Sequence, residues 1–378
     1  MKKIIFITGT RADYGKIKNL IQGLQQRKNF KVFLFVTGIH NLKDFGSTYL
    51  EIISDKIKNI SRFKNQKLNE PMDKVFNKTC EGFSAYLKKV KPDMVIVHGD
   101  RVEAIACAIT ACLCGIKIGH IEGGEVSGTV DEILRHAISK IANIHFVANN
   151  KAKKRLIQLG EEKKNIFVTG SPDIDLLLKS NLPNINKVKK RYSIKYKKYA
   201  IAIFHPVTTE FNELDNHLNE FVKALEDSKR NYVLILPNND YGVKKILNYY
   251  KKIKNKNFRK LPSMRFEYYL SLLKNSEFII GNSSSGIIEA PYFGVQTINV
   301  GSRQNNRANL KTIYNCEPIK EKIIQTISKV LRVKKKKLNK NYHYGSGNSK
   351  NQFLKILAKE SLWKSSNQKY FKDLFFRK

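Results

Sequence analysis

Acidic residues follow two short apolar runs in the first half of the chain, in the segments His98-Gly99-Asp100-Arg101 and His120-Ile121-Glu122-Gly123-Gly124-Glu125. More ionisable residues come at the start of the next expected helix: Asp131, Glu132, Arg135 and His136. Carboxylates beside a substrate can exchange protons with it. Each acid alone is more often a helix cap or an ion-pair partner. Because such a cluster is costly to bury without a task, the acids together predict a functional site.

A possible phosphate site follows the first apolar run, in the segment Thr8-Gly9-Thr10-Arg11-Ala12-Asp13-Tyr14-Gly15. Gly9 permits a tight turn, and the N-terminus of the helix beyond it can face an anion. Arg11 offers a planar fork to a diphosphate or to uracil. The segment is not a GxGxxG fingerprint, which argues against NAD. An ordinary strand-to-helix turn is the alternative.

The second half has its own candidate, Gly281-Asn282-Ser283-Ser284-Ser285-Gly286, which follows a predicted strand and is expected to open a helix over 285–293. Backbone N–H groups and serine hydroxyls there could cradle a pyrophosphate. Glu289 is placed to accept hydrogen bonds from ribose hydroxyls. A simple N-cap is the alternative. His205-Pro206 and Pro237-Asn238 also end predicted strands of this half.

The elements that must position these residues alternate between apolar strands and helices. In the first half we expect strands at Lys3–Thr8, Lys31–Thr37, Met94–His98, Lys117–Glu122, His145–Ala148 and Ile166–Thr169. Residues 41–70 are expected to be a polar, loop-rich stretch. Short apolar runs separated by helices indicate parallel strands with helices on both faces. Ligands bind such sheets at the carboxyl ends of the strands, where the polar residues stand.

The same alternation restarts after a polar stretch at Lys179–Tyr199, which we take as the linker. The next strands are expected at Ala200–Phe204, Tyr232–Pro237, near Phe258, at Phe278–Gly281 and at Thr297–Val300. The predicted fold is therefore α/β, with two doubly wound Rossmann-like domains and a site in the cleft between them. The domains are expected at 1–178, with the carboxylates, and at 179–360. A basic, aromatic tail, 361–378, is expected to be helical and to pack back on the first domain.

The composition restricts the class of protein. Hydrophobic residues make up 42% of the 378 residues, which suits two globular domains. Apolar runs such as Met94–Val97 are far below the roughly 20 residues that span a bilayer. Ile4–Ile7 is too short for a signal-peptide core, so a cytoplasmic location without membrane contact is expected. The cysteines Cys112 and Cys114 lack a second Cys/His pair and are interpreted as core thiols rather than zinc ligands.

The formal net charge of +38 allows a nucleic-acid-binding alternative. The charges are spread along the chain, with one dense run at Lys334–Lys337, and no nucleic-acid-binding motif accompanies them. We therefore expect no nucleic-acid partner. A positive field would still attract a substrate that carries two phosphates.

Several of these segments, taken together, resemble the hydrolysing UDP-N-acetylglucosamine 2-epimerases, a family that includes enzymes of sialic- and legionaminic-acid synthesis. They are GTRADYGK, HGDR, HIEGGEVSGTVDEILRHAISK, FHPVTT, PNND, GNSSSGIIEAPYFGVQTINVGSRQ and YGSGNS, in this order from about residue 4 to 358. The resemblance implies a glycosyltransferase-B-like fold with UDP held mainly by the second domain. The IEGGEVSG stretch favours the hydrolysing branch over the non-hydrolysing one.

The resemblance also implies roles for individual residues. Catalytic roles fall on Asp100, Glu122 and Asp131, and contacts to the substrate and its UDP fall on Arg11, Arg101, His205, Asn238, Ser283, Ser284, Glu289 and Arg303, with Arg307 a weaker candidate. No cofactor and no metal are implied. A homodimer or homotetramer, formed through the first domain, is expected.

The implied reaction converts UDP-N-acetylglucosamine and water to N-acetylmannosamine and UDP. Its steps are elimination of UDP to a glycal and hydration of that glycal. The same reaction on UDP-2,4-diacetamido-2,4,6-trideoxyglucose is the first alternative. A glycosyltransferase of the same fold is the second, and it would need an acceptor. Which carboxylate acts as base in the elimination is left open.

Overall fold

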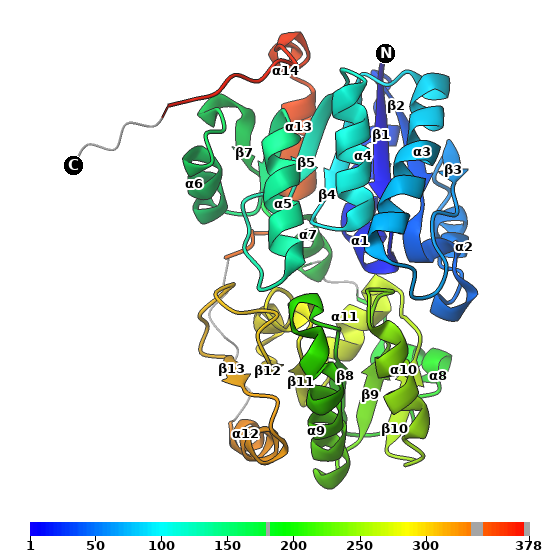
Figure 1. Ribbon diagram of the computed structural model, residues 1–378, viewed down its shortest axis with the longest axis vertical. Helices are drawn as coiled ribbons and strands as arrows, with labels where there is room; N and C mark the ends of the chain where they lie inside the picture. Colours follow the sequence, from blue (N-terminus) through cyan, green and yellow to red (C-terminus); the bar gives the residue numbers. More distant parts are fainter. Residues whose placement is uncertain (179–181, 334–342, 374–378) are drawn as a thin grey trace, which may run out of the picture.

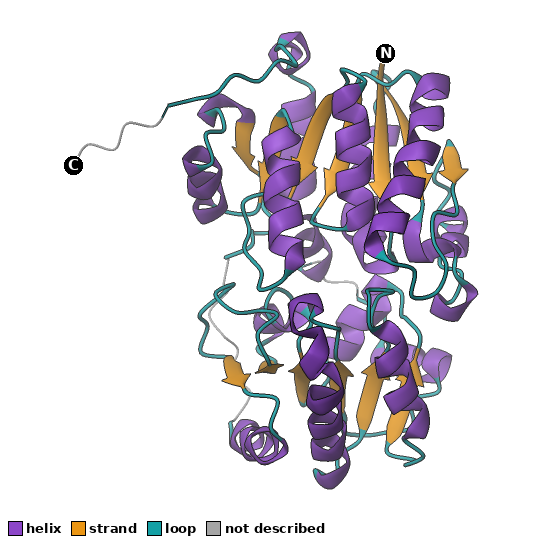
Figure 2. Cartoon of the chain, in the orientation of Figure 1, coloured by secondary structure: helices purple, strands orange, loops and turns teal. Residues whose placement is uncertain are grey.

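Two β-sheets, each with all of its strands parallel, organise the chain in the computed structural model, which describes residues 1–178, 182–333 and 343–373. Each sheet, together with the helices that pack on it, is called a layer below. The first layer contains β1 to β7 and the second contains β8 to β13, and the first stands above the second in Figure 1. Helices cover both faces of each sheet, as Figure 2 shows. The fold is α/β and glycosyltransferase-B-like, which confirms the predicted class.

The first sheet has seven strands in the order β3-β2-β1-β4-β5-β6-β7. They are β1 (Lys2–Thr8), β2 (Phe30–Val36), β3 (Ile60–Arg62), β4 (Met94–His98), β5 (Lys117–Ile121), β6 (Ile144–Val147) and β7 (Ile166–Val168). The central strands are almost entirely buried, because helices remove both of their faces from water. This explains why they appear in the sequence as continuous apolar runs and not as alternating ones.

Helices pack on the two faces of this sheet in two hydrophobic clusters. One cluster contains side chains of α1 and the other contains side chains of α3, α4 and α5. The helices of the first layer are α1 (Arg11–Gln25), α2 (Tyr49–Ser54), α3 (Met72–Val90), α4 (Val102–Leu113), α5 (Val130–Ile141), α6 (Asn150–Gln158) and α7 (Pro172–Leu177). The 3₁₀ turns η1 (Gly38–Asn41), η2 (Lys43–Phe45) and η3 (Lys163–Asn165) complete it.

The second sheet has six strands in the order β10-β9-β8-β11-β12-β13. They are β8 (Ala200–Ile203), β9 (Tyr232–Ile235), β10 (Phe258–Leu261), β11 (Phe278–Gly281), β12 (Gln296–Val300) and β13 (Ile313–Cys316). Its helices are α8 (Ile185–Tyr192), α9 (Leu214–Asp227), α10 (Val243–Lys252), α11 (Phe266–Lys274) and α12 (Lys320–Arg332), with 3₁₀ turns η4 (Thr208–Glu213), η5 (Ser284–Gly286) and η6 (Ala290–Phe293).

Three sequence-based expectations need correction. The stretch 41–70 is loop-rich, as expected, although it also holds α2 and the edge strand β3, which is only three residues long. The expected linker contains helix α8, and the edge strand β13 was not expected. The segment 285–293 is not one helix but the two turns η5 and η6, with Pro291 as the second residue of η6 and Gly294 ending it in a left-handed conformation. Short edge strands and 3₁₀ turns carry weak periodicity, which explains these misses.

The end of the chain returns to the first layer. Helix α13 (Ser349–Leu357) buries Phe353 and Leu357 in the cluster that α1 shares, although the predicted second domain extended to residue 360. The expected tail is helical only in α14 (Glu360–Lys364), and 365–373 runs on without a helix. Polar contacts such as that of Asn143 with the carbonyl of Asn367 attach it to the first layer. Residues 374–378 and the run at Lys334–Lys337 lie outside the described residues.

The expectation of core thiols at Cys112 and Cys114 is wrong. Both are exposed at the end of α4, where the chain turns toward β5, and Leu113 between them is 84% exposed. An apolar stretch at a helix end therefore misled the sequence argument. Among the described residues, no helix is both long enough and apolar enough to cross a bilayer.

Candidate functional site

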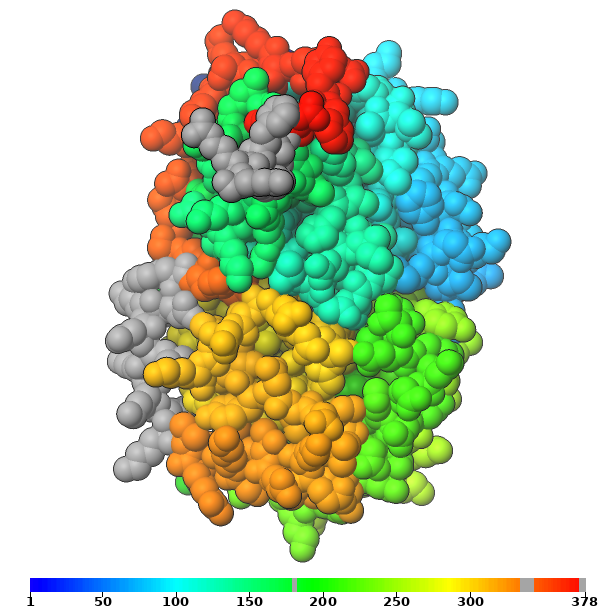
Figure 3. Space-filling model, turned by 60° about the vertical axis from the view of Figure 1, so that its left-hand side comes forward, coloured from blue at the N-terminus to red at the C-terminus, as the bar shows by residue number. Residues whose placement is uncertain are grey.

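The candidate site is a pocket between the two layers, at the carboxyl ends of both sheets. Figure 3 shows how closely the layers meet, with the gold part of the second layer beneath the green and cyan parts of the first. The predicted site residues all line this pocket: Arg11, Asp100, Arg101, Glu122, Asp131, His205, Asn238, Ser283, Ser284, Glu289, Arg303 and Arg307. The structure thus brings together residues that lie up to almost three hundred positions apart in the sequence.

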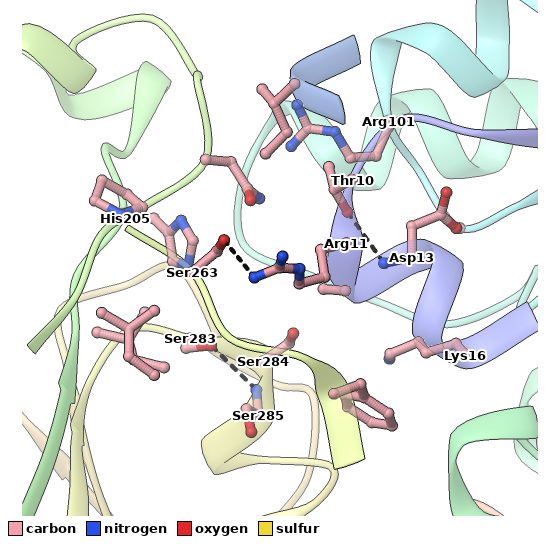
Figure 4. A pocket seen from close by; sticks show the side chains of 18 of the residues that line it. Thr10, Arg11, Asp13, Lys16, Arg101, His205, Ser263, Ser283, Ser284 and Ser285 are labelled. Carbon is pink, nitrogen blue, oxygen red and sulfur yellow. Dashed lines mark hydrogen bonds between the residues drawn. The ribbon is translucent and has the colours of Figure 1, made fainter. Parts of the chain in front are cut away.

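The sheet topology explains the convergence. In the first sheet the strand order reverses between β1 and β4, so that the residues after these strands flank a crevice. Arg11 follows β1, and Asp100 follows β4. In the second sheet the reversal lies between β8 and β11, which are followed by His205 and Ser283. The two crevices face each other across the pocket, and Figure 4 shows Arg11 and Lys16 on one side and Ser283, Ser284 and Ser285 on the other.

One guanidinium connects the first two predicted catalytic acids. Arg135, on α5, pairs through Nη2 with the carboxylate of Asp100 and donates through Nη1 to the carbonyl oxygen of Glu122 at 2.8 Å. Arg135 is only 2% exposed, so this contact is screened little by water. Burial favours the neutral form of Asp100, but Arg135 and Arg307 outweigh it and hold the pKa of this carboxyl below its ordinary value. Asp100 is therefore ionised at neutral pH.

Glu122 is fixed through both of its carboxylate oxygens. One oxygen accepts a hydrogen bond from the hydroxyl of Ser171, and the other lies 3.3 Å from Nε2 of His98. Its backbone has φ of 63°, in the left-handed region that non-glycine residues seldom occupy. Burial favours its neutral form, yet the Lys16 ammonium and the His98 ring keep the pKa of Glu122 well below its usual value. Strain at this position is typical of functional sites.

Asp131 has the opposite electrostatic character. Burial and the nearby Asp100 carboxylate raise the pKa of Asp131 above its ordinary value, although Arg303 acts against them. Nη2 of Arg303 lies 2.9 Å from the Asp131 carboxylate and joins the two layers. Among the three predicted catalytic acids, Asp100 and Glu122 therefore have a lowered pKa and Asp131 a raised one. This separation suits paired base and acid roles.

Lys16 is surrounded by acids at the floor of the pocket. Its ammonium lies 3.0 Å from Asp173 and 3.8 Å from Glu289. Burial lowers the pKa of Lys16, but Asp173 and Glu122 outweigh this, so the pKa is raised and the ammonium is retained. Burial raises the pKa of Glu289 to about 7, with partial compensation by Lys16.

The second layer presents neutral donors and a close backbone approach. Asn282 accepts from the backbone N–H of His205 at 2.6 Å and donates back to its carbonyl at 2.9 Å, which fixes the loop after β8. Burial lowers the pKa of His205 to about 3, so its ring is neutral. Only glycine fits at Gly281, because a Cβ there would lie 1.9 Å from the carbonyl oxygen of Ile203. The serine segment opens a 3₁₀ turn and not the expected helix, so a helix dipole does not contribute.

The two predicted phosphate arginines of the first layer already have acidic partners. Arg11 lies 2.9 Å from Glu51 and donates to the Ser263 hydroxyl of the second layer at 2.8 Å, as Figure 4 shows. Arg101 lies 3.0 Å from Asp240, also of the second layer. Both guanidiniums therefore reach across the pocket, where an anionic ligand would compete with these contacts.

Several site residues were given no individual role from the sequence: Asp13, Lys16, His98, Ser171, Asp173 and Arg135, although Arg135 was named in the predicted ionisable cluster. Lys16 and His98 stand in segments that we had singled out, but nothing in their spacing assigned them a task. Ser171 and Asp173 follow β7, so the strand-end argument used for Asp100 could also have found them.

In the described part of the chain, no group of three or more histidine, cysteine, aspartate or glutamate side chains is placed to hold a metal ion. The arginine and lysine side chains that face the pocket are Arg11, Lys16, Arg101, Arg135, Arg303 and Arg307. The arrangement can bind a diphosphate through these cations and exchange protons through the carboxylates.

The fold and the pocket define a two-layer α/β enzyme that can bind a diphosphate, and similarity to known proteins gives its family. The chain belongs to the UDP-N-acetylglucosamine 2-epimerase family, whose model matches residues 22–358. A UDP-N-acetylglucosamine 2-epimerase of Neisseria meningitidis serogroup B is 42% identical over 375 residues, which cover 99% of this chain and 100% of that protein.

The chain is also similar to a second relative and to a solved structure. A UDP-N,N'-diacetylbacillosamine 2-epimerase (hydrolyzing) of Legionella pneumophila is 32% identical, over 94% of this chain and 96% of that protein. The UDP-GlcNAc 2-epimerase of Methanocaldococcus jannaschii, solved in complex with UDP-GlcNAc and UDP, superimposes with a TM-score of 0.81. It is 22% identical and the match covers 94% of this chain and 99% of that chain, so this likeness concerns the fold.

Proposed function

We propose that the protein is a hydrolysing UDP-N-acetylglucosamine 2-epimerase, which converts UDP-N-acetylglucosamine and water to N-acetylmannosamine and UDP. The observation that carries the proposal is the convergence of Asp100, Glu122 and Asp131 on one pocket that the serine segment of the second layer also lines. The hydrolysing mode is supported by the name of the Legionella relative. It is also supported by the IEGGEVSG segment, which contains Glu122.

The first half of the reaction breaks the bond between C1 and the diphosphate oxygen, and the electron pair leaves with UDP. The C2 proton of the ground state is not acidic, but positive charge that develops at C1 acidifies it sharply. An ionised carboxylate beside the ring stabilises this charge and takes the C2 proton, which leaves a double bond between C1 and C2. Asp100 and Glu122, whose pKa is lowered, fit this role.

The second half adds water across that double bond. A proton reaches C2 from the opposite face, and hydroxide from water reaches C1 while a carboxylate takes the remaining water proton. Asp131 fits the proton donor, because its raised pKa favours the protonated form. The result is a free sugar with inverted C2.

The cations of the pocket replace a divalent metal in this proposal. Arg11, Arg101 and Arg303 would stabilise the departing diphosphate, together with the hydroxyls of Ser283 and Ser284. Glu289 would accept from the ribose, and Asn238 and His205 would contact the nucleotide. UDP is thereby assigned mainly to the second layer.

The test is turnover of UDP-N-acetylglucosamine by the purified protein in deuterated water. Elimination followed by hydration places one deuterium at C2 of the released N-acetylmannosamine, which proton NMR detects. Return of an epimerised UDP-sugar would indicate the non-hydrolysing reaction instead. A requirement for an acceptor would indicate a glycosyltransferase, and a product without deuterium would exclude the elimination.

A second candidate substrate is UDP-2,4-diacetamido-2,4,6-trideoxyglucose, which would undergo the same reaction. The Legionella relative, named for UDP-N,N'-diacetylbacillosamine, favours it. Release of UDP from the two UDP-sugars in parallel assays, compared by kcat/KM, distinguishes them. N-Acetylmannosamine as the preferred product would connect the protein to sialic-acid-type sugar synthesis.

We also propose a cytoplasmic enzyme that acts as a homodimer or homotetramer formed through the first layer. The mass in solution, measured by light scattering, tests the assembly. Cell fractionation tests the location.

A further inference from the structure

His98 lies between two carboxylates that come from different parts of the first layer. Its Nδ1 is 2.7 Å from Oδ1 of Asp13, on α1, and its Nε2 is 3.3 Å from Oε2 of Glu122, after β5. The side chains of the three residues are only 12%, 8% and 7% exposed, in the order Asp13, His98, Glu122. Three strand-end segments thus meet in one line of carboxylate, imidazole and carboxylate on the pocket wall.

Both ends of this line are fixed. The second oxygen of Asp13 accepts from the backbone N–H of Gly9 at 3.1 Å, and the backbone of Asp13 donates to the hydroxyl of Thr10. At the other end, Ser171 donates to the second oxygen of Glu122. A carboxylate with both oxygens engaged loses its freedom to rotate, so the line defines where Glu122 points.

The charges of the line favour an imidazolium. Burial alone would lower the pKa of His98, but the Glu122 and Asp13 carboxylates raise it to about 9. Other ionisable groups also act on the two carboxylates. Lys16 and Arg307 interact with Glu122, whose carbonyl Arg135 contacts, and His40 interacts with Asp13. The neighbouring His120 is neutral, because burial lowers its pKa to about 3.

We propose that His98 and Asp13 are positioning residues, which hold Glu122 ionised and aimed at the sugar ring; this rests on the proposed function. Glu122 must start each turnover as a carboxylate in order to accept a proton, whether from C2 or from water. An imidazolium at its oxygen maintains that state, and Asp13 maintains the imidazolium. A buried ionic line is a costly way to hold a fold together, and apolar side chains would serve that purpose as well.

The test is the pH dependence of kcat/KM in wild type and in Asp13→Asn. Loss of the Asp13 charge should lower the pKa of His98 to between about 7 and 8, because one adjacent opposite charge commonly shifts a pKa by about 1 to 2. We expect wild type to lose activity above about pH 9. The variant should lose activity at a hydroxide concentration at least about tenfold lower, that is, at least about one pH unit below wild type. Below pH 6.5 the two should agree within about threefold.

A merely structural role of Asp13 predicts another result, namely the same fractional loss at every pH, and this result would overturn the proposal. Superimposable profiles would overturn it equally. UDP affinity, measured by calorimetry at pH 6.5, should be equal in wild type and in Asp13→Asn.

A second variant, His98→Gln, keeps a hydrogen-bonding group without the charge. It should lower kcat about 100-fold or more and should show no further loss of activity at alkaline pH. The matched control is His217→Gln in the second layer, with wild-type kinetics.

An NMR titration of the histidine Cε1–H signals reports on the line without turnover. The His98 signal, assigned by its loss in His98→Gln, should titrate near pH 9 in wild type and lower in both Asp13→Asn and Glu122→Gln. If no UDP-sugar is turned over, the proposed function fails. The titration still tests whether His98 is held as an imidazolium between Asp13 and Glu122. A His98 signal that titrates in wild type near the ordinary histidine pKa of about 6.5 would overturn the inference.

Discussion

Asp131 and Arg303 connect the two layers across the pocket, with 2.9 Å between the carboxylate oxygen and the guanidinium nitrogen. The connection is reinforced by the backbone, because the N–H of Gly128 donates to the carbonyl of Arg303 at 2.9 Å. Only glycine allows this approach, since a Cβ at position 128 would lie 2.4 Å from the carbonyl oxygen of Ser302. An arginine assigned to the diphosphate is therefore already engaged by an acid assigned to catalysis.

Substitution Asp131→Asn separates these two tasks. Removal of the carboxyl group frees Arg303 for the diphosphate, so UDP affinity should rise about fivefold, or about 1 kcal/mol. Turnover should fall at least about 100-fold, because the proton donor is lost. Calorimetry with UDP and a coupled UDP-release assay measure the two effects. Asp215→Asn, at an exposed pair with Lys245, is the control and should change neither. Weaker UDP binding by Asp131→Asn would contradict the competition.

Substitution Asp100→Asn should abolish turnover and leave UDP binding intact. The amide keeps the shape of the side chain but cannot accept a proton or stabilise positive charge at C1, so a loss of about 10²–10⁴-fold or more is expected. Arg135 loses its ionic partner, and thermal unfolding of the variant checks that the fold survives. Rates close to wild type would remove Asp100 from the mechanism.

Much of the fold could be predicted because the buried parallel strands are continuous apolar runs. β1, β4 and β5 were found where the sequence placed them, and with them the polar residues at their ends. The edges were harder to predict: β3 and β13 are short, and in β13 all four residues are exposed or half-buried, which leaves no apolar signal. Helix α13 carries Phe353, and no local pattern shows that this side chain packs on the first sheet.

The site could be predicted as a set of strand-end residues, but its electrostatics could not. The sequence places Asp100 and Asp131 near each other, yet the opposite directions of their pKa shifts depend on which arginines surround each carboxyl. Likewise, the partners of Lys16 lie on α7 and after η5, more than 150 positions away, and only tertiary structure brings them together.

The elevated pKa of Glu289 predicts a dependence of stability on pH. Its folded pKa is about 7 against an ordinary value of 4.5, so the folded state binds this proton more tightly. The associated stability is fully present below about pH 4.5 and is lost as the pH rises toward 7. Glu289→Gln, which resembles the protonated form, should therefore gain stability relative to wild type as the pH rises from 5 to 8, by up to about 3 kcal/mol.

Urea unfolding of both proteins at pH 5 and pH 8 measures this difference. The control is Glu360→Gln, whose side chain is 86% exposed in an i,i+4 pair, and which should show no such trend. An equal stability difference between wild type and Glu289→Gln at the two pH values would show that Glu289 is ionised throughout this range.

The described part of the tail, 365–373, is attached by Lys369. Its ammonium donates to the carbonyl oxygens of Lys140 at 2.6 Å and Ala142 at 2.7 Å, and it also contacts Glu161. Glu161 is nearly buried beside His145, so loss of Lys369 leaves acceptors without a donor and a carboxylate with one fewer cation. Lys369→Met should therefore lower the free energy of unfolding by about 1–3 kcal/mol.

The midpoint of urea unfolding measures this loss, and kcat/KM should stay at the wild-type value because the tail is attached far from the pocket, at the upper end of the first layer in Figure 1. Lys364→Met is the matched control, since Lys364 is 79% exposed and pairs with Glu360 at the surface. That variant should unfold within about 0.5 kcal/mol of wild type. Equal effects of the two substitutions would mean that the contacts of Lys369 with Lys140, Ala142 and Glu161 add nothing beyond a surface charge.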